Sequence, residues 1–269
     1  MGRNRKREPK WLQSARTGTW DRKLPGEKPD WLRRVLTRAG AVAPSEVEAV
    51  VRAGRVRVAG QRVREPMTLV RPDDEVLLDG RRVERRPRTL VIAFHKPAGS
   101  IVSSRDPSGA PTVFDLLNAV LPPELARFGW HAVGRLDKNT TGLLLFTNDE
   151  RFAEFGTRPE THLPKRYVAE VQGRPEESDL EPLRKGIVLD DGPTRPARAR
   201  VLGEGKVELT ISEGRNHQVK RMLAAVGFPV RKLHREAIGE LVLDVAEGQW
   251  RMLEEEEIRE KLRFVDGRP

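Results

Sequence analysis

The sequence predicts an α+β fold in which a large domain with a mostly antiparallel sheet follows a small basic domain that mixes helices and strands. Two observations lead to this prediction. After residue 90, many short strand patterns and scattered helical patterns occur without a repeated strand-helix-strand order. In addition, residues 1–90 contain 23 Lys and Arg against 12 Asp and Glu, whereas residues 91–269 contain 27 against 28. Such a change in net charge indicates a domain boundary near residue 90.

The composition excludes several classes of protein. With 269 residues, the chain is long enough for one large domain or two smaller ones. It has no cysteine, which excludes disulfides, thiolate zinc sites, iron–sulfur clusters and cysteine nucleophiles. Its longest apolar runs are too short to cross a bilayer, and its basic start lacks the apolar core of a secretory signal. We therefore expect a cytoplasmic protein without a membrane partner, and the net charge of +10 favours a nucleic acid as partner.

Residues 1–30 are predicted to form a flexible basic arm. They contain nine basic residues and three prolines and show no apolar periodicity. Such an arm can neutralise phosphates without sequence preference. Trp11 and Trp20 could stack on unpaired bases or, equally, pack on the surface of the following domain.

A compact basic unit of two helices and a few short strands is predicted over residues 31–80. In chain order its elements are a helix from Leu32 that ends at Gly40, a helix from Pro44 or Ser45 to Gly54, strands at 56–58 and around Val63, and a strand at 76–78 followed by a tight turn at Asp79 and Gly80. Arginines occur throughout the unit, at positions 33, 34, 38, 52, 55, 57, 62 and 64.

This stretch, with RAGRVRVAGQRV as its most diagnostic part, resembles the alpha-L motif, an RNA-binding module named after a small-subunit ribosomal protein. In that family the helix pair and the following loop contact RNA phosphates. The resemblance therefore implies binding of structured RNA, with substrate contacts assigned to Arg33, Arg34, Arg55 and Arg57. One departure is at the start of the second helix, where the family usually has Ser and two basic residues and this chain has APSE at 43–46. The alternative is a basic packing domain that binds no RNA.

An arginine-rich linker at 81–89 is predicted to lead into the large domain, residues 90–255. LVIAFHKPAGSIVSS predicts a strand, a Lys-Pro turn and another short strand. The further predicted strands are 142–147, 167–171, 187–189, 199–202 and 207–211, and the predicted helices are 113–121, 150–157, 178–186 and 216–226. No phosphate-binding loop of the Walker or G-x-G-x-x-G type is present. Residues 256–269 are predicted to be a C-terminal tail, helical and then frayed, whose glutamates face solvent or a protein.

Asp137 is the first candidate for a reactive side chain. It lies between a tight turn at Gly134 and the strand 142–147, which is apolar on both faces and is therefore expected at the centre of the sheet. Neighbouring cations and hydrogen-bond donors favour the ionised form of a carboxylate. An ionised, partly desolvated aspartate can act as a base or a nucleophile. The alternative is a surface turn in which this carboxylate is only a cap.

Two other stretches bring polar groups to apolar elements. In LPKRYVAEV, Tyr167 lies in a strand after Lys165 and Arg166. In ISEGRNHQVKRMLAAVG, a strand ends and polar residues crowd the first turns of a helix, where backbone donors and the helix dipole favour an anion. For His217 alone, a structural role is the alternative to a catalytic one.

Together these stretches resemble the RsuA/RluB type of pseudouridine synthase, enzymes that modify ribosomal RNA. The matching pieces, in family order, are KPAGSIVS (96–103), GRLDKNTTGLLLFTND (134–149), KRYVAEV (165–171), EGRNHQVKRM (213–222) and LHREAIGELVL (233–243). With the basic domain, the resemblance covers about residues 31–260.

The resemblance implies roles for individual residues. Asp137 matches the catalytic aspartate of the family, Tyr167 its active-site tyrosine, and Lys220 the basic residue that pairs with the aspartate. Arg135 would place the flipped nucleotide or hold its loop. The remaining candidates for substrate contacts are Arg215, Asn216, His217, Gln218, Arg221 and Arg235. Isomerisation of uridine gains or loses no atoms or electrons, so no cofactor and no metal are expected.

The predicted function is isomerisation of a specific uridine in ribosomal RNA, of the large subunit rather than the small, by a monomer that acts on the RNA or on an assembly intermediate. The carboxylate would stabilise or capture positive charge on the ribose, or remove a ribose proton; both routes stay open. A rival function from another class is a non-catalytic RNA-binding factor for ribosome assembly with the same fold. A third is an RNA hydrolase that uses the same carboxylate.

Overall fold

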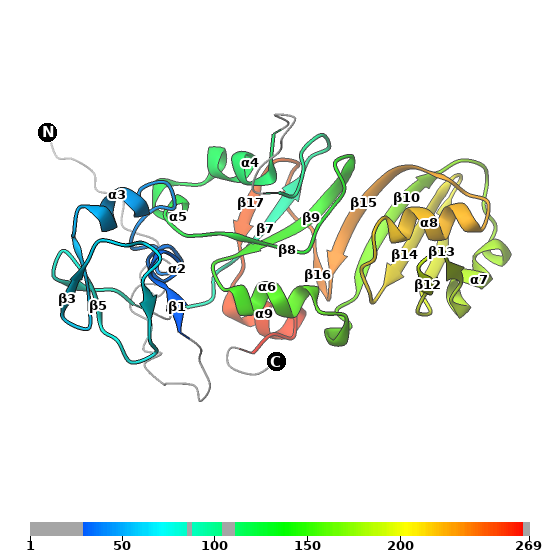
Figure 1. Cartoon of the computed structure of the whole chain (residues 1–269). Coiled ribbons are helices and arrows are strands. Elements are labelled where there is room, and N and C mark those ends of the chain that lie inside the picture. Colours follow the sequence, from blue (N-terminus) through cyan, green and yellow to red (C-terminus); the bar gives the residue numbers. More distant parts are fainter. Residues whose placement is uncertain (1–28, 85–87, 104–110, 266–269) are drawn as a thin grey trace, which may run out of the picture. The chain divides into compact units, whose positions relative to one another are not determined.

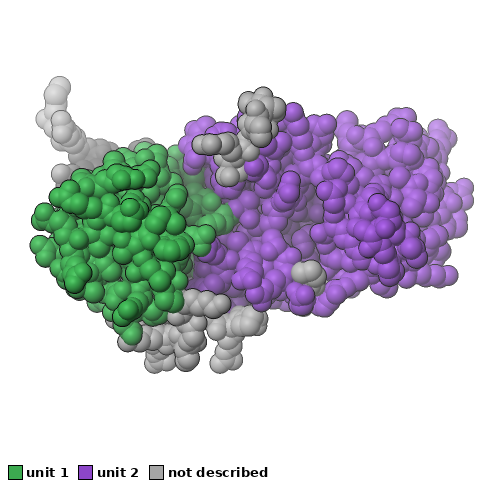
Figure 2. Space-filling view, viewed as in Figure 1, with its two compact units in different colours: residues 1–90, 121–131 green, residues 91–120, 132–269 purple. Residues whose placement is uncertain are grey.

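A computed structural model describes residues 29–84, 88–103 and 111–265 (Figure 1). The chain divides into two compact units: unit 1 comprises Met1–Leu90 and Leu121–His131, and unit 2 comprises Val91–Val120 and Ala132–Pro269 (Figure 2). The predicted arm lies outside the described residues up to position 28, as do residues 85–87 of the predicted linker. Across the described residues, no helix is long and apolar enough to cross a membrane.

Unit 1 has the predicted pair of helices followed by short strands. Its elements are β1 (Asp30–Trp31), α2 (Leu32–Arg38), α3 (Val47–Arg52), β2 (Val56–Val58), β3 (Gln61–Val63), β4 (Leu69–Val70), β5 (Val76–Leu78), β6 (Arg81–Arg82) and α5 (Pro123–Ala126). The order β3-β2-β5-β6 forms an antiparallel sheet, and β1 pairs with β4. Apolar side chains of α2, α3 and the strands form one buried cluster.

The sheet of unit 1 extends into the segment that the sequence predicts to be a linker. Asp79 and Gly80 both have positive φ, +48° and +78°, which turns the chain back sharply. Arg81 and Arg82 then pair with β5 as β6, and Val83 is buried in the core of the unit. The structured part of unit 1 therefore continues at least to Val83.

Unit 1 also includes residues 121–131, which the sequence analysis placed in the large domain. Leu125, Phe128 and Trp130 are buried. The Gly129 N–H donates to the carbonyl of Thr37 at 2.9 Å. At Gly40, with φ +61°, a Cβ would lie 2.7 Å from the ring of Phe128, so this glycine permits the close approach. Burial of this apolar segment against the first helix explains why it departs from the predicted boundary.

Unit 2 is built on a nine-stranded sheet. Its strands are β7 (Val91–Lys96), β8 (His131–Val133), β9 (Thr140–Thr147), β10 (Lys165–Val171), β13 (Arg198–Gly203), β14 (Lys206–Ile211), β15 (Val230–Ile238), β16 (Leu241–Val242) and β17 (Trp250–Met252). The main order is β13-β14-β10-β15-β9-β7-β17. The pair β9–β15 is parallel and the other pairs along this order are antiparallel, which confirms the predicted α+β fold. Leu143–Phe146 of β9 are fully buried, as expected for a central strand.

The helices of unit 2 agree with the prediction except at particular ends. They are α4 (Val113–Val120), α6 (Glu150–Thr157), η1 (Pro159–Thr161), η2 (Glu177–Leu180), α7 (Glu181–Lys185), α8 (Gln218–Ala225) and α9 (Glu255–Lys261), and β11 (Val188–Leu189) pairs with β12 (Gly192–Pro193). The helix predicted from residue 216 begins at Gln218, because His217 adopts the left-handed conformation with φ +47°. The short strand predicted after the Lys-Pro turn is only a bridge between Ile101 and Thr112.

The C-terminal helix packs against unit 2. Ile258, Leu262 and Phe264 belong to a buried cluster that also contains Phe152 of α6. The rings of Phe152 and Phe264 meet edge to face with centroids 4.8 Å apart, and α6 and α9 lie side by side (Figure 1). The helix predicted at the start of the C-terminal tail is present as α9. The fraying predicted after it does not begin before Phe264, because Leu262 and Phe264 are buried. Residues 266–269 lie outside the described part of the chain.

Candidate active site

A pocket of about 560 Å³ opens in unit 2 where the loop before β9, the strands β10 and β15 and the start of α8 come together. Most of the residues singled out in the large domain line it, namely Arg135, Asp137, Tyr167, Arg215, Asn216, His217, Gln218 and Arg235. Lys220 and Arg221 are not among the lining residues. Lys220 nevertheless reaches the pocket through its contact with Asp137.

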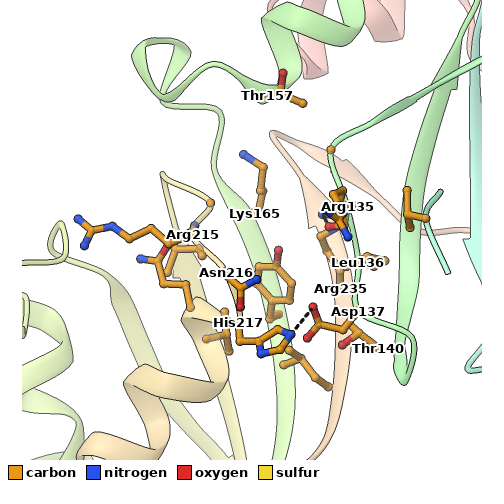
Figure 3. Close-up of a pocket in the computed structure, with 18 of the residues that line it drawn as sticks. Arg135, Leu136, Asp137, Thr140, Thr157, Lys165, Arg215, Asn216, His217 and Arg235 are labelled. Carbon is orange, nitrogen blue, oxygen red and sulfur yellow. Dashed lines mark hydrogen bonds and ion pairs between the residues drawn. The ribbon is translucent and has the colours of Figure 1, made fainter. Parts of the chain in front are cut away.

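The carboxylate of Asp137 is held by two side chains from the start of α8. Lys220 Nζ lies 2.7 Å from Asp137 Oδ2. His217 Nε2 lies 3.4 Å from Asp137 Oδ1 (Figure 3). The left-handed conformation of His217 places its imidazole beside the carboxylate instead of along the helix. The Asp137 side chain is 30 % exposed, so it is partly desolvated but open to the pocket.

Lys96 binds the backbone of the loop that carries Asp137. This side chain is fully buried at the end of β7. Its ammonium donates to three backbone carbonyls: Pro97 at 2.9 Å, Lys138 at 3.1 Å and Thr140 at 3.0 Å. Burial lowers the pKa of Lys96 to about 8. Sequence analysis did not assign a role to Lys96, although a lysine at the end of an apolar strand is a signal for a buried, satisfied cation.

Arg235 connects β15 to the same loop. Its guanidinium is 1 % exposed and donates through Nε to the Leu143 carbonyl at 2.7 Å and through Nη1 to the Arg135 carbonyl at 3.4 Å. Among the described residues, Nη2 has no hydrogen-bond partner. A Cβ on Gly142 would lie 2.2 Å from the Arg235 carbonyl oxygen, so the glycine permits β9 and β15 to approach here.

Tyr167 and Lys165 form the part of the pocket wall that comes from β10. Tyr167 is 8 % exposed and lies directly opposite Arg235 in the β10–β15 pair, so both side chains lie on one face of the sheet. Lys165 is two residues away on the same face and also lines the pocket. Burial, together with the charge of Arg235, lowers the pKa of Lys165 to about 8. The sequence patterns indicated Lys165 only as a neighbour of Tyr167 and not as a site residue. The available signal was its position two residues before Tyr167, because side chains two residues apart in a strand lie on the same face.

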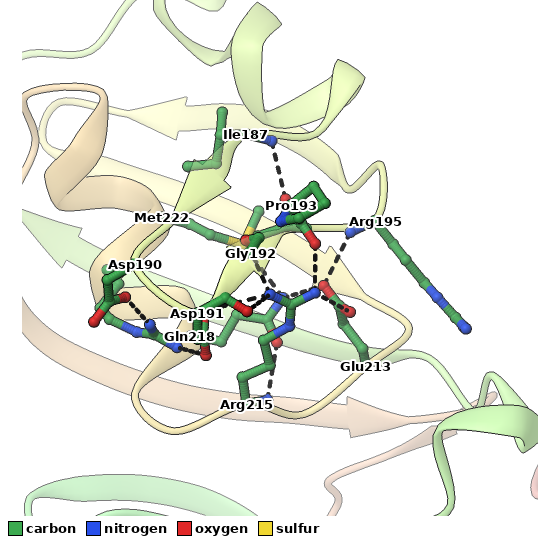
Figure 4. A network of polar contacts seen from close by, with 12 residues as sticks. Ile187, Asp190, Asp191, Gly192, Pro193, Arg195, Glu213, Arg215, Gln218 and Met222 are labelled. Atoms are coloured by element: carbon green, nitrogen blue, oxygen red, sulfur yellow. Dashed lines mark hydrogen bonds and ion pairs between the residues drawn. The ribbon is translucent and has the colours of Figure 1, made fainter.

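A polar network fixes the start of α8 to the β11–β12 hairpin (Figure 4). Gln218 is buried; its Oε1 accepts from the Arg215 N–H at 3.0 Å, and its Nε2 donates to Glu213 Oε1 at 2.5 Å. Arg215 donates to the Gly192 carbonyl at 3.0 Å. Arg221 pairs with Asp190 and, at 2.8 Å, with Asp191, and this hydrogen bond lowers the pKa of Asp191. Arg215 and Arg221 thus have partners within the chain, and their substrate contacts stay a prediction.

The four arginines singled out in the basic domain all belong to unit 1. Arg33, Arg34, Arg55 and Arg57 are exposed. Arg55 forms a bidentate pair with Asp79, at 3.0 Å from Nε to Oδ1 and 2.5 Å from Nη2 to Oδ2. Arg57 donates to the Gly60 carbonyl at 3.3 Å. Their contacts with RNA also stay a prediction.

The site combines one carboxylate with several cations and an aromatic side chain in a partly closed space. Over the described residues, no group of three or more His, Asp or Glu side chains is arranged to hold a metal ion. An ionised carboxylate beside a lysine can stabilise positive charge on a substrate or attack it as a nucleophile. Cations that line the pocket, such as Arg135 and Lys165, favour an anionic substrate.

Comparison with known proteins agrees with this chemistry. A family model described as RNA pseudouridylate synthase matches residues 90–225, and an S4 domain matches residues 30–76. The chain is 37 % identical over 211 residues to "Ribosomal large subunit pseudouridine synthase B" of Bacillus subtilis (strain 168), which covers 76 % of this chain and 84 % of that protein. It is 36 % identical over 241 residues to "Uncharacterized RNA pseudouridine synthase" of Aquifex aeolicus (strain VF5), which covers 87 % and 94 %.

A solved structure titled "Crystal structure of pseudouridylate synthase" superposes on the chain with a TM-score of 0.60 at 33 % identity, covering 86 % of this chain and 99 % of that one. The family match includes Asp137 and Lys220, and the sequence relatives extend over more than three quarters of the chain. The chain is therefore an enzyme that belongs to the RNA pseudouridylate synthase family and carries an S4 domain.

Proposed function

We propose that this enzyme converts a uridine of large-subunit ribosomal RNA to pseudouridine, with Asp137 as the carboxylate that acts at the ribose. The observation that carries the proposal is the position of Asp137, which lines a pocket large enough for a nucleotide while Lys220 lies 2.7 Å from its Oδ2. Relatives named as large-subunit synthases support the choice of RNA. The small-subunit RNA is the second candidate.

Asp137 acts while the bond between ribose C1′ and ring nitrogen N1 is exchanged for a bond between C1′ and ring carbon C5. In one route the carboxylate attacks C1′ as the electron pair of the C1′–N1 bond leaves with the uracil. In the other route it takes a proton from C2′, and a C1′=C2′ double bond forms as the same pair leaves. C5 then bonds to C1′: in the first route the bond between C1′ and the carboxylate breaks as C5 attacks, and in the second route the carboxylic acid returns its proton to C2′. In both routes the C5 proton is then lost and N1 gains a proton, so atoms and electrons balance.

The neighbouring side chains support this chemistry. Lys220 and His217 orient the carboxylate from the start of α8, and Tyr167 offers an aromatic face to the uracil. Arg135, whose backbone carbonyl is held by Arg235, contacts the flipped nucleotide or keeps its loop in place. Asn216, Gln218 and Arg215 line the pocket and complete the substrate contacts.

A uridine in structured RNA must leave its stack before it can enter the pocket, which costs a few kcal/mol. Phosphate contacts from the basic surface of unit 1 offset this cost. The proposal includes action as a monomer. The lack of cysteine is in keeping with a cytoplasmic enzyme that acts on ribosomal RNA or an assembly intermediate.

The test compares the wild-type protein with Asp137→Asn on unmodified ribosomal RNA. Wild-type protein should form pseudouridine at a defined position, and the variant should lose at least about 10⁴-fold of the rate, because the carboxylate makes the step possible. Asp244→Asn is the matched control, since this exposed aspartate pairs with Arg251 outside the pocket. Pseudouridine is mapped position by position in both ribosomal RNAs.

Other outcomes would overturn the proposal. Equal activity of Asp137→Asn and wild type would remove Asp137 from the mechanism. Release of free uracil or strand scission would identify a hydrolase. RNA binding by the wild-type protein without any pseudouridine would favour the non-catalytic assembly factor.

A further inference from the structure

Lys165 is a cation in the pocket to which the reaction described above gives no role. Its ammonium has one hydrogen bond within the described residues, to the Leu163 carbonyl at 3.1 Å, and no carboxylate pairs with it. An ammonium has three donors, so two are left for a ligand. Desolvation of a charged lysine that has no counter-ion lowers the stability of the fold, so such a lysine is a candidate for a functional group.

The position of Lys165 relative to Asp137 and Tyr167 suggests what it binds. In Figure 3 the Lys165 ammonium points toward the end of the pocket at which Thr157 lies, away from Asp137. Tyr167 lies two residues along the same face of β10. If Asp137 acts at C1′ and Tyr167 lies beside the ring, the far edge of the uracil faces Lys165.

The detached uracil carries negative charge at that edge. When the C1′–N1 bond breaks, its electron pair stays on the ring, and conjugation spreads the charge from N1 to the carbonyl oxygens O2 and O4. In the six-membered ring, C4 lies opposite N1 and C2 lies opposite C5. A cation at the far edge therefore faces O4 before the ring turns and O2 after C5 has turned toward C1′.

We propose that Lys165 donates a hydrogen bond to a carbonyl oxygen of the detached uracil and stabilises the anion in both ring orientations. The inference rests on the proposed function of Asp137 and adds a catalytic residue to it. Fixed donors aimed at developing negative charge are an effective means of lowering a barrier in a partly closed site. Arg235 adds positive charge from the strand opposite, and its own hydrogen bonds hold it in place.

The pKa of Lys165 fits this role and supplies a readout. Burial and the charge of Arg235 lower this pKa to about 8, so the side chain is mostly protonated at pH 7. The ammonium loses its proton as the pH rises through 8, and with it the stabilisation of the anion. The single-turnover rate of the wild-type protein should fall above about pH 8, and in Lys165→Arg this fall should move to higher pH.

The central experiment compares two RNA fragments that differ only in the target base, uridine or 5-fluorouridine, in single-turnover assays that follow loss of the starting nucleotide. This readout is common to both bases, whereas the final loss of a proton from C5 is possible only with uridine. Lys165→Met should slow the reaction of uridine about 10²-fold. The loss should be several-fold smaller with 5-fluorouridine, because fluorine withdraws electron density and itself stabilises the detached anion. Lys165→Arg should retain at least about a tenth of the wild-type rate.

Arg166→Met is the matched control. Arg166 is the next residue of β10, but its guanidinium lies on the other face, 2.8 Å from Glu236, and does not line the pocket. This variant should react like wild type with both RNAs. Thermal unfolding of all variants establishes that they are folded, and removal of a partly buried charge that has no carboxylate partner among the described residues should not destabilise Lys165→Met.

Three results would overturn the assignment of Lys165. The first is a wild-type rate in Lys165→Met, and the second is an equal loss of rate with uridine and 5-fluorouridine. The third is a deuterium isotope effect with uridine labelled at C5 that appears only in Lys165→Met, since it would make Lys165 the base that removes the C5 proton. If the wild-type protein forms no pseudouridine, the proposed function itself fails; if wild type and Arg166→Met are active and Lys165→Met equals them, only the role of Lys165 fails.

Discussion

At the scale of single residues, two kinds of contact hold Asp137, the carboxylate for which we propose the reaction at the ribose. Lys220 and His217 contact the carboxylate itself. Lys96 and Arg235 instead bind the backbone carbonyls of its loop, at Lys138, Thr140 and Arg135. The first kind sets the charge around the reacting group, and the second fixes its position. The two kinds should therefore respond differently to substitution.

Replacement of Lys220 tests the first kind of contact. Lys220→Met should lower kcat about 10- to 150-fold with little change in KM, because a charge-assisted hydrogen bond contributes roughly 1.5–3 kcal/mol and Lys220 lies outside the pocket lining. Lys220→Arg should restore most of the rate. Steady-state kinetics on an RNA fragment measure both values. If Lys220 had only a structural role, Lys220→Met would instead lower the amount of folded protein, and Lys220→Arg would not specifically restore kcat.

At the scale of elements, α8 and α9 are fixed by charged side chains at their first turns. The start of α8 is tied to the β11–β12 hairpin by Arg215 and Arg221. In α9, Glu257 accepts from Arg251 of β17 at 2.7 and 2.9 Å and from Lys261 at 2.9 Å. These ion pairs orient helices whose apolar faces are then buried. Glu257 is a suitable place to measure such a contribution, because it is far from the chemistry in sequence and lines no part of the pocket.

Glu257→Gln should lower the free energy of unfolding by about 1–2 kcal/mol at pH 7, a value reduced for screening by solvent near the surface. Hydrogen bonds from Arg251 lower the pKa of Glu257 from about 4.5 to about 2. The unfolded chain therefore binds this proton first as the pH falls, so the contribution is complete above about pH 4.5 and disappears toward pH 2. Urea unfolding of wild type and variant across this range measures the difference.

Glu256→Gln is the control for this prediction, since the neighbouring glutamate is exposed and should contribute little. A difference between wild type and Glu257→Gln that does not shrink as the pH falls from 4.5 to 2 would contradict the role given to the Arg251 pair.

At the scale of the whole molecule, the excess of positive charge and the reactive pocket belong to different units. Residues 1–90 contain 23 Lys and Arg against 12 Asp and Glu, and the pocket is lined only by residues of unit 2. Deletion of residues 1–80 would be a poor test of this division, because it would uncover Leu125, Phe128 and Trp130, which are buried within unit 1. Substitution of exposed arginines leaves the core of unit 1 intact.

The double substitution Arg33→Gln and Arg57→Gln should weaken RNA binding and reduce the slope of log K against log salt by about 1.5, because each phosphate contact contributes roughly 0.7–0.9. The rate at saturating RNA should stay unchanged. Arg174→Gln, which removes an exposed arginine of unit 2 that pairs with Glu204, should leave the slope as it is. Binding titrations at several salt concentrations provide the measurement, and an unchanged slope in the double variant would contradict RNA contact by unit 1.

Local patterns in the sequence were sufficient for most elements and for the choice of Asp137 as a candidate carboxylate. Apolar periodicity predicted the helix pair of unit 1 and the central strand β9, and the density of polar groups around a core strand singled out Asp137. The errors are instructive. The start of α8 was predicted two residues early, since nothing local indicates the left-handed conformation of His217. The tail from residue 256 and the segment 121–131 were misplaced because their burial depends on distant partners.

By itself, the sequence determined the α+β class, the separation of charge near residue 90 and the motifs that resemble pseudouridine synthases, because each depends on composition or on short-range order. The tertiary structure decided which of the many cations are already paired with a carboxylate. Arg221 and Arg55 are engaged by carboxylates, whereas Lys165 has no carboxylate partner among the described residues. Only strand pairing brings Lys165, Tyr167 and Arg235 onto one face. Whether two charges pair depends on the distance between them in the folded structure, and this distance cannot be derived from their spacing in the sequence.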